Sequence, residues 1–198
     1  GSQAWSDASS HAHTIGGSNA SVQLSTSAPL FGSACLLLPD NGFLWSAVAS
    51  ADFQAGVLDF AIEIGFKTSQ PSTQCGIVDF RTTANQVAPT IFKTGGAFGY
   101  QTSLTTQISG GTVLTNTWQR LAYCRVSGVG RLFVDGTQVG SNYTDSNNYN
   151  VTNYPIWVGG AFNGANHYAG FADELRYTVG DGRHSANYTV DAAAFPNS

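Results

Sequence analysis

A tight hairpin in the second half of the chain constrains its fold more than any other feature. A strand-like run at 130–134 is followed by Asp135-Gly136 and by a second run at 137–141. Asp-Gly between apolar residues is a strong signal for a two-residue turn that joins antiparallel strands. Further strand-like runs lie at 117–127 and 168–178. Together these segments predict an antiparallel sheet.

Short strand-like runs also cover the rest of the chain. Phe60, Ile62, Ile64 and Phe66 alternate with other residues and share one face of an extended segment. No segment keeps a helical apolar stripe over ten residues. We predict strands at 12–15, 20–25, 34–38, 43–48, 59–68, 75–82, 89–93, 97–103, 105–109, 117–127, 130–134, 137–141, 155–160 and 168–178. This pattern is typical of an all-β, two-sheet antiparallel jelly-roll sandwich.

The charge content of the chain is unusually low. Charged residues make up 10% of the sequence, against about 25% in an average protein. Eight Lys and Arg against twelve acids leave no basic stripe for phosphates, which argues against nucleic-acid binding. No apolar run approaches the roughly 18 residues of a membrane span, so we expect no membrane insertion. A neutral polar surface suits extracellular particles and proteins that face sugars.

The domain organisation is expected to be simple. Residues 1–10 are small and polar, the chain contains no Met, and we interpret this stretch as a tag remnant and lead-in segment. Residues 11–198 are expected to form a single domain, which is large enough to bury a core without disulfides.

The chain has three cysteines, an odd and small number that does not allow a full disulfide framework. We predict that Cys35, Cys75 and Cys124 are small buried hydrophobes. One disulfide among the three remains an open alternative, and the sequence does not choose the pair.

Several segments in fixed order carry a resemblance to a known family. Residues 117–140 contain Trp118-Gln-Arg-Leu-Ala-Tyr-Cys124 and the Val134-Asp-Gly136 hairpin, and residues 170–177 contain Asp173-Glu174. They are accompanied by 7–14, 31–36, 50–53, 58–67, 154–160 and 179–189. In this order the segments resemble the laminin-G-like (concanavalin-A-like) jelly-roll domains of bacteriophage tail fibres and other virion proteins. Residues 38–42 depart from the family pattern, where a Phe-Asp-Gly turn is usual.

The resemblance bears on catalysis, because related glucanases cleave sugars with a Glu-x-Asp-x-Glu strand. This chain has only two Glu, Glu63 and Glu174, and lacks that motif. Glycosidases need two carboxyls about 5–5.5 Å or 6.5–9.5 Å apart, which a pair of Asp would also satisfy. There is no Gly-x-Ser-x-Gly elbow either. We therefore predict that the chain is not an enzyme. His13 and His184 fall at positions that look structural, and His11 is expected at the surface.

The resemblance also implies a structural Ca²⁺. In related jelly rolls the Asp of the C-terminal strand ligates this ion, together with oxygens of the N-terminal region. Asp173 and Asp7 are the corresponding candidates here. Calcium takes six to eight oxygen ligands, many of them carbonyls or waters, so two Asp suffice. The alternative is that Asp173 only hydrogen-bonds a neighbouring loop.

A sugar site needs an aromatic platform and polar groups that fix hydroxyls. Two loops, 147–154 and 159–168, supply both. Trp157 lies between them, and in a strand it faces away from Ile156 and Val158. That face is either a wall of a sugar groove or part of a second core layer. The predicted ligand-binding residues are Trp157, Asn148, Tyr149, Asn163, Asn166 and His167.

These observations favour a non-catalytic glycan-binding module that recognises host receptors, within a phage virion protein such as a tail fibre or spike. A structural capsid or tail decoration protein is the alternative, and a glycan-cleaving enzyme is the third. The expected partners are cell-surface glycans or other virion proteins. We also expect assembly as a homotrimer and a virion or extracellular location.

Overall fold

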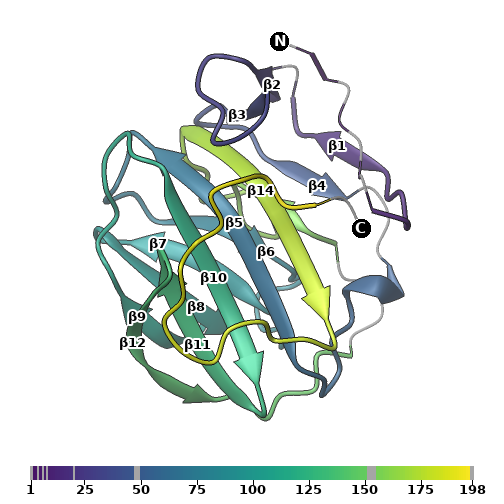
Figure 1. Ribbon diagram of the computed structural model, residues 1–198. Coiled ribbons are helices and arrows are strands. Elements are labelled where there is room, and N and C mark those ends of the chain that lie inside the picture. Colours follow the sequence, from purple (N-terminus) through teal and green to yellow (C-terminus); the bar gives the residue numbers. More distant parts are fainter. Residues whose placement is uncertain are drawn as a thin grey trace.

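The computed structural model describes residues 2–3, 5, 7, 9–19, 21–46, 50–150 and 155–196. It confirms an all-β sandwich of two antiparallel sheets (Figure 1). One sheet, here the front sheet, contains in spatial order β12 (Thr137–Thr144), β11 (Val129–Val134), β10 (Gln119–Val126), β5 (Phe60–Thr68), β14 (Gly170–Val179), β3 (Cys35–Leu38) and β2 (Gln23–Ser25). The other, the back sheet, contains β1 (Ile15–Gly17), β4 (Leu44–Ser46), β13 (Trp157–Val158), β6 (Cys75–Asp79), β7 (Thr90–Thr94), β8 (Ala97–Thr102) and β9 (Thr105–Gly110).

Helix is nearly absent from the described residues. A single 3₁₀ turn, η1 (Ala51–Phe53), follows β4. No helix within the described ranges is long and apolar enough to cross a membrane.

Each predicted strand corresponds to an observed one, and the ends differ where the backbone leaves the extended region. The run predicted at 12–15 is observed as β1, which starts only at Ile15, because Ala12 has a positive φ of 49°. The run predicted at 155–160 shrinks to β13, because Gly159 turns with a φ of 84°. The hairpin is confirmed: Asp135 and Gly136 both have positive φ, as a type I′ turn requires.

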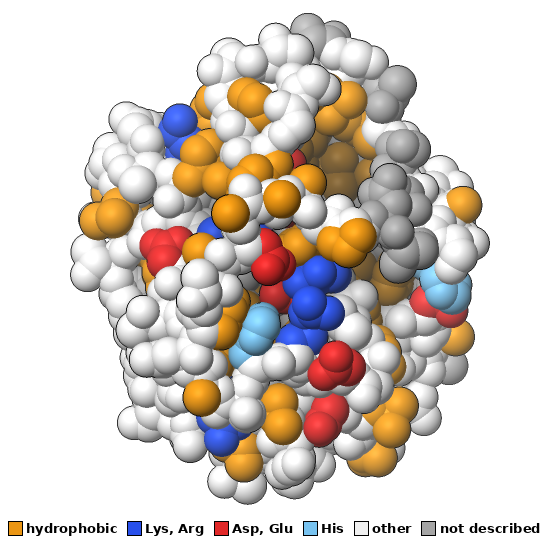
Figure 2. Space-filling view, in the orientation of Figure 1, with side chains coloured by type: hydrophobic (Ala, Val, Ile, Leu, Met, Phe, Trp, Pro, Cys, Tyr) orange, Lys and Arg blue, Asp and Glu red, His pale blue; other side chains and the backbone are white. Residues whose placement is uncertain are grey.

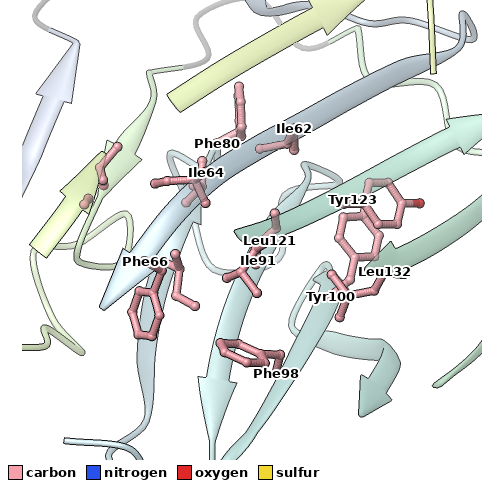
Figure 3. Packing of buried hydrophobic residues seen from close by; sticks show 14 of the residues in the cluster. Ile62, Ile64, Phe66, Phe80, Ile91, Phe98, Tyr100, Leu121, Tyr123 and Leu132 are labelled. Atoms are coloured by element: carbon pink, nitrogen blue, oxygen red, sulfur yellow. The ribbon is translucent and has the colours of Figure 1, made fainter. Parts of the chain in front are cut away.

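The core lies between the two sheets (Figure 3). Side chains of β5 and β10, such as Phe66 and Leu121, face Ile91 and Phe98 of the back sheet. The predicted alternation along β5 is confirmed, since its four large apolar residues are at most 1% exposed. Each such side chain contributes about 1.5–3 kcal/mol to folding through burial.

The outer face of the front sheet is covered by the C-terminal segment that follows β14. This segment runs across β5 and β10 (Figure 1), and Tyr188 packs against a small apolar cluster there that includes Phe133. Glu63 of β5 is 4% exposed and forms ion pairs of 2.8 and 2.9 Å with Arg176 and Arg183. Figure 2 shows basic, acidic and histidine side chains meeting on this face. Both faces of the front sheet are therefore covered, one by the core and the other by the C-terminal segment.

The three cysteines are buried and free, as the simpler prediction had it. Burial raises the pKa of Cys35 to about 11 and those of Cys75 and Cys124 to about 12. The thiols therefore act as small apolar side chains in the packing.

Candidate functional site

Two tryptophans lie side by side on the outer face of the back sheet. Trp45 of β4 is directly opposite Trp157 of β13 in the strand register. Their ring centroids are 6.1 Å apart with planes at 24°. Leu44 and Val158, their neighbours along the strands, pack with the core. Since side chains alternate along a strand, both tryptophans point away from the core, and both are half-buried.

Further aromatic rings extend this pair. The ring of Phe43 lies 5.3 Å from that of Trp157 and 5.6 Å from the imidazole of His167, with which it is stacked. We call the surface made by Phe43, Trp45, Trp157, Phe162 and His167 the tryptophan face. All five side chains are only partly buried. His167 Nε2 has no hydrogen-bond partner among the described residues.

A buried ion pair lies beside the two tryptophans on the same face of the back sheet. The row of the two tryptophans continues through Asp79 at the end of β6. Asp79 is 0% exposed, and its carboxylate accepts hydrogen bonds of 2.9 and 2.8 Å from the guanidinium of Arg81. It also accepts from Thr90 Oγ1 at 3.0 Å and from the backbone N–H of Phe162 at 3.0 Å. One carboxylate thus ties β6, β7 and the loop after β13 together.

Arg81 contributes to the tryptophan face in two further ways. Its guanidinium lies 5.1 Å from the centre of the Phe162 ring, in a cation–π arrangement. Its backbone carbonyl accepts a hydrogen bond of 3.1 Å from the indole Nε1–H of Trp157. Because Asp79 neutralises Arg81, the pair adds no net charge to this surface.

Glycine allows the loop after β13 to lie against Phe43. A Cβ at Gly160 would approach Phe43 and His167 to 3.1 and 3.2 Å. Gly164 has a φ of 69°, and a Cβ there would lie 3.1 Å from the Phe43 ring. Side chains at these positions would push the loop away from the aromatic rings.

The structure brings part of the predicted ligand set together. Trp157 and His167 meet through Phe43, and Asn163 and Asn166 are exposed on the same loop as His167. Asn163 Oδ1 accepts a hydrogen bond of 3.2 Å from Ala165 N, which shapes the tip of the loop. Trp157 lies on the outer face of the back sheet and not in a second core layer, and its place in the wall of a sugar groove stays a prediction.

The other predicted loop does not contribute its aromatic ring. Tyr149 is 0% exposed, and its hydroxyl is hydrogen-bonded to Asp145 at 2.9 Å and to Tyr100 at 2.8 Å. A ring in this position offers no platform to a sugar, so Tyr149 belongs to the core. Asn148 is exposed but lies beside Gly56. Residues 151–154 of this loop are outside the described residues.

The two predicted calcium ligands contact different segments. Asp173 Oδ2 accepts from the backbone N–H groups of Leu30 at 2.9 Å and Phe31 at 3.3 Å. Asp7 accepts from the N–H groups of Ser9 and His13, both at 2.9 Å. Asp173 therefore braces a loop, as the alternative to calcium binding had it, and burial raises its pKa. Calcium at these residues stays a prediction.

Neither glutamate is placed as a free carboxylate on the tryptophan face. Glu63 is paired with two arginines under the C-terminal segment. Glu174 accepts a hydrogen bond from the backbone N–H of Phe195. Both groups thus have structural partners.

Sequence reasoning missed Phe43, Trp45, Asp79, Arg81 and Phe162. Trp45 lies within a predicted strand, and its alternation with Leu44 was a usable signal. The pairing of β4 with β13, which places it beside Trp157, joins residues more than one hundred positions apart and has no local signal.

A cavity of about 200 Å³ lies between the sheets, away from the tryptophan face. Its walls come from β1 and β4 on one side and from β3 and β14 on the other, and they include Trp5, Ile15, Leu36 and Leu44. The lining is mostly apolar, and Asp173 and Glu174 also contribute to it.

Comparison with known protein families shows to which family the chain belongs. The family model Laminin_G_3, described as the concanavalin A-like lectin/glucanases superfamily, matches residues 45–178. The chain belongs to this family. A search of curated proteins found no significant match.

Solved structures share the fold of this laminin G-like domain at low sequence identity. Domain 4 of AbnA, a GH43 extracellular arabinanase from Geobacillus stearothermophilus in complex with arabinotriose, has a TM-score of 0.59 and 15% identity, covering 86% of this chain and 83% of that one. The mouse laminin alpha1 chain domains LG4-5 have a TM-score of 0.51 and 20% identity, covering 79% and 46%. The Ruminococcus gnavus IT-sialidase CBM40 bound to alpha2,3 sialyllactose has a TM-score of 0.51 and 13% identity, covering 66% and 80%.

Proposed function

We propose that this domain is a non-catalytic glycan-binding module whose ligand lies on the tryptophan face. The observation that carries the proposal is the half-exposed pair Trp45–Trp157 on the outer face of the back sheet. The front sheet has its own cover, the C-terminal segment, whereas the two indoles point out of the back sheet.

The chemistry of this surface suits a sugar. Flat, partly exposed aromatic rings accept the apolar face of a pyranose or furanose, and nearby polar groups select its hydroxyls. The loop that carries Asn163, Asn166 and His167 lies next to the rings and supplies the exposed amide groups of its two asparagines. Because Arg81 is neutralised by Asp79, we expect neutral glycans to bind more tightly than acidic ones.

Two of the similar structures support a glycan ligand. The arabinanase domain is in complex with arabinotriose, and the CBM40 module is bound to sialyllactose. The low charge content of this chain agrees with an uncharged ligand.

The contacts of the acidic side chains support a non-catalytic role. A glycosidase needs an acid and a second carboxylate on opposite sides of the scissile bond. Asp79, the buried carboxylate beside Trp157, already accepts hydrogen bonds from Arg81, Thr90 and the backbone N–H of Phe162. A carboxylate held by these donors is poorly placed to give or take a proton.

A glycan array tests the proposal, followed by calorimetry on the best ligand. The array should include arabinan fragments, neutral hexose polymers, sialylated glycans, bacterial lipopolysaccharide and capsule. Trp45→Ala is expected to weaken binding by about tenfold or more, since aromatic anchors at the centre of an interface cost the most when truncated.

Trp118→Ala is the matched control, because Trp118 is also half-buried but belongs to the front sheet beside Phe171. Its affinity should equal that of the wild type. Equal affinity of the Trp45 variant, or silence across the whole array, would count against the proposal. Release of reducing ends from any bound glycan would instead restore the enzyme hypothesis.

The finer context is also a proposal. We place the domain in a phage tail fibre or spike that recognises host surface glycans, at a virion or extracellular location. A homotrimer would present three weak sites at once and raise avidity. Light scattering of the purified chain measures the oligomeric state. Oligomers that bind no glycan would favour the decoration-protein alternative.

A further inference from the structure

Three metal-ligating side chains converge where the segment before β1 meets η1. His11 Nδ1 lies 3.0 Å from Asp52 Oδ2, and His13 Nε2 lies 3.3 Å from the same oxygen. The three ligand atoms all fall within 4.8 Å of one another. The two imidazoles are nearly parallel, with planes at 3° and centroids 5.8 Å apart.

The spacing of these atoms fits a first-row transition metal. Zinc binds imidazole nitrogen at about 2.0–2.1 Å and carboxylate oxygen at about 2.0–2.2 Å in tetrahedral geometry. The edges of such a tetrahedron measure roughly 3.3–3.5 Å from those bond lengths. The two nitrogen–oxygen distances of 3.0 and 3.3 Å are already close to this value. The two imidazole nitrogens, at most 4.8 Å apart, would have to approach to about 3.3–3.5 Å to admit an ion.

We propose that His11, His13 and Asp52 form a binding site for Zn²⁺ or a similar divalent transition metal. Imidazole ligands favour Zn²⁺, Ni²⁺ and Cu²⁺ over Ca²⁺ and Mg²⁺, which prefer oxygen alone. Three protein ligands leave a fourth position for water or another donor. The side chain of His11 is 55% exposed, so the ion reaches the site from solvent.

Neighbouring groups hold the ligands in place. Asp7 accepts hydrogen bonds from the N–H groups of Ser9 and His13. These bonds shape the turn before β1 that carries both histidines. Ser50 Oγ donates to Asp52 Oδ2 at 2.8 Å and accepts from the Asp52 N–H at 3.1 Å. Such outer contacts orient metal ligands in proteins.

The site is also anchored to the core. The ring of His13 lies 4.6 Å from that of Phe53, which follows Asp52 in η1 and is 8% exposed. A bound metal would therefore link the segment before β1, which carries both histidines, to η1, which carries Asp52. In Figure 2 a histidine and an acidic side chain meet at the right-hand edge, near the short helix of Figure 1.

Calorimetric titration of the metal-free protein with Zn²⁺ tests the proposal. One ion should bind per chain, and His11→Ala should weaken binding by at least about tenfold, because loss of even an outer partner of a metal ligand costs about 10–100-fold in affinity. His11 is exposed, so its loss should leave the fold of the metal-free protein intact. His167→Ala is the matched control and should bind Zn²⁺ as the wild type does.

A melting experiment provides the second measurement. Zn²⁺ at ten times its Kd should raise the Tm of the wild type by about 3–6 °C and that of His11→Ala by much less. The Co²⁺ derivative should show a d–d spectrum without a thiolate charge-transfer band, since all three cysteines are buried elsewhere. Wild-type affinity in both His11→Ala and Asp52→Asn, or no binding at millimolar Zn²⁺, would overturn the proposal.

Discussion

Trp157 and Trp45 occupy directly paired positions on β13 and β4, with ring centroids 6.1 Å apart and planes only 24° from parallel. Two strands of two and three residues would bury little surface by themselves. Their place between β1 and β6 in the back sheet, and the Asp79–Arg81 pair beside them, fix the indoles on the outer surface. The proposed glycan-binding surface depends on this arrangement.

The first prediction concerns the ion pair next to the tryptophans. Asp79→Ala leaves Arg81, which is 3% exposed, as an uncompensated buried charge. Removing one partner of a buried pair typically costs about 3–5 kcal/mol of unfolding free energy. Urea denaturation should show a loss of this size. Asp191→Ala, at an exposed position, should stay within about 0.5 kcal/mol of the wild type. Equal stability of the two variants would contradict the role given to Asp79.

The second prediction concerns alkaline pH. Burial raises the pKa values of Tyr100, Tyr123 and Tyr149, whereas the unfolded chain titrates near 10.0. Above pH 10 the unfolded state loses protons that the folded state keeps. The contribution of these tyrosines to the free energy of unfolding is therefore fully present below pH 10. Above pH 10 it falls by about 1.4 kcal/mol per pH unit for each such tyrosine.

Tyr149→Phe separates this effect from packing. The variant should lose about 1–3 kcal/mol at neutral pH, because Asp145 loses a buried hydrogen-bond donor. Its stability should then fall less steeply above pH 10, by the equivalent of one proton. Urea unfolding across the alkaline range measures both quantities. Identical slopes for the variant and the wild type would show that Tyr149 does not contribute to the pH dependence.

The third prediction concerns the C-terminal segment. Glu63→Ala removes the carboxylate that pairs with Arg176 and Arg183. The amide of Tyr188, which donates to the Gly136 carbonyl at 2.9 Å, should exchange its hydrogen about tenfold faster or more. Amides of β10 should change less, because local release of the segment leaves the sheet intact. A uniform increase over the whole domain would instead indicate global destabilisation.

Much of the fold was predictable from local pattern. Phe60, Ile62, Ile64 and Phe66 show which face of β5 is buried, because the period of two is a property of the strand itself. The Asp135-Gly136 turn was predictable for the same reason, since only a few dipeptides favour two positive φ values. Strand ends such as that at Gly159 depend on individual φ angles and were less well predicted.

The candidate site was only partly predictable, because it depends on contacts between distant residues. Tyr149 lies in an Asn-rich segment that looks like a polar loop. It is buried because Asp145 and Tyr100 bind its hydroxyl, and Tyr100 is 49 positions away. Likewise, nothing in the local sequence indicates that His11 and His13 both lie next to Asp52, because the fold alone brings these distant residues together.

The most direct test of the account follows the indole N–H signals of the four tryptophans by NMR while the best glycan from the array is added. The glycan is predicted to shift the signals of Trp45 and Trp157 in a saturable manner and to leave that of Trp118 on the front sheet in place. A saturable shift of Trp118 alone, with Trp45 and Trp157 unmoved, would contradict the claim that the tryptophan face binds the glycan.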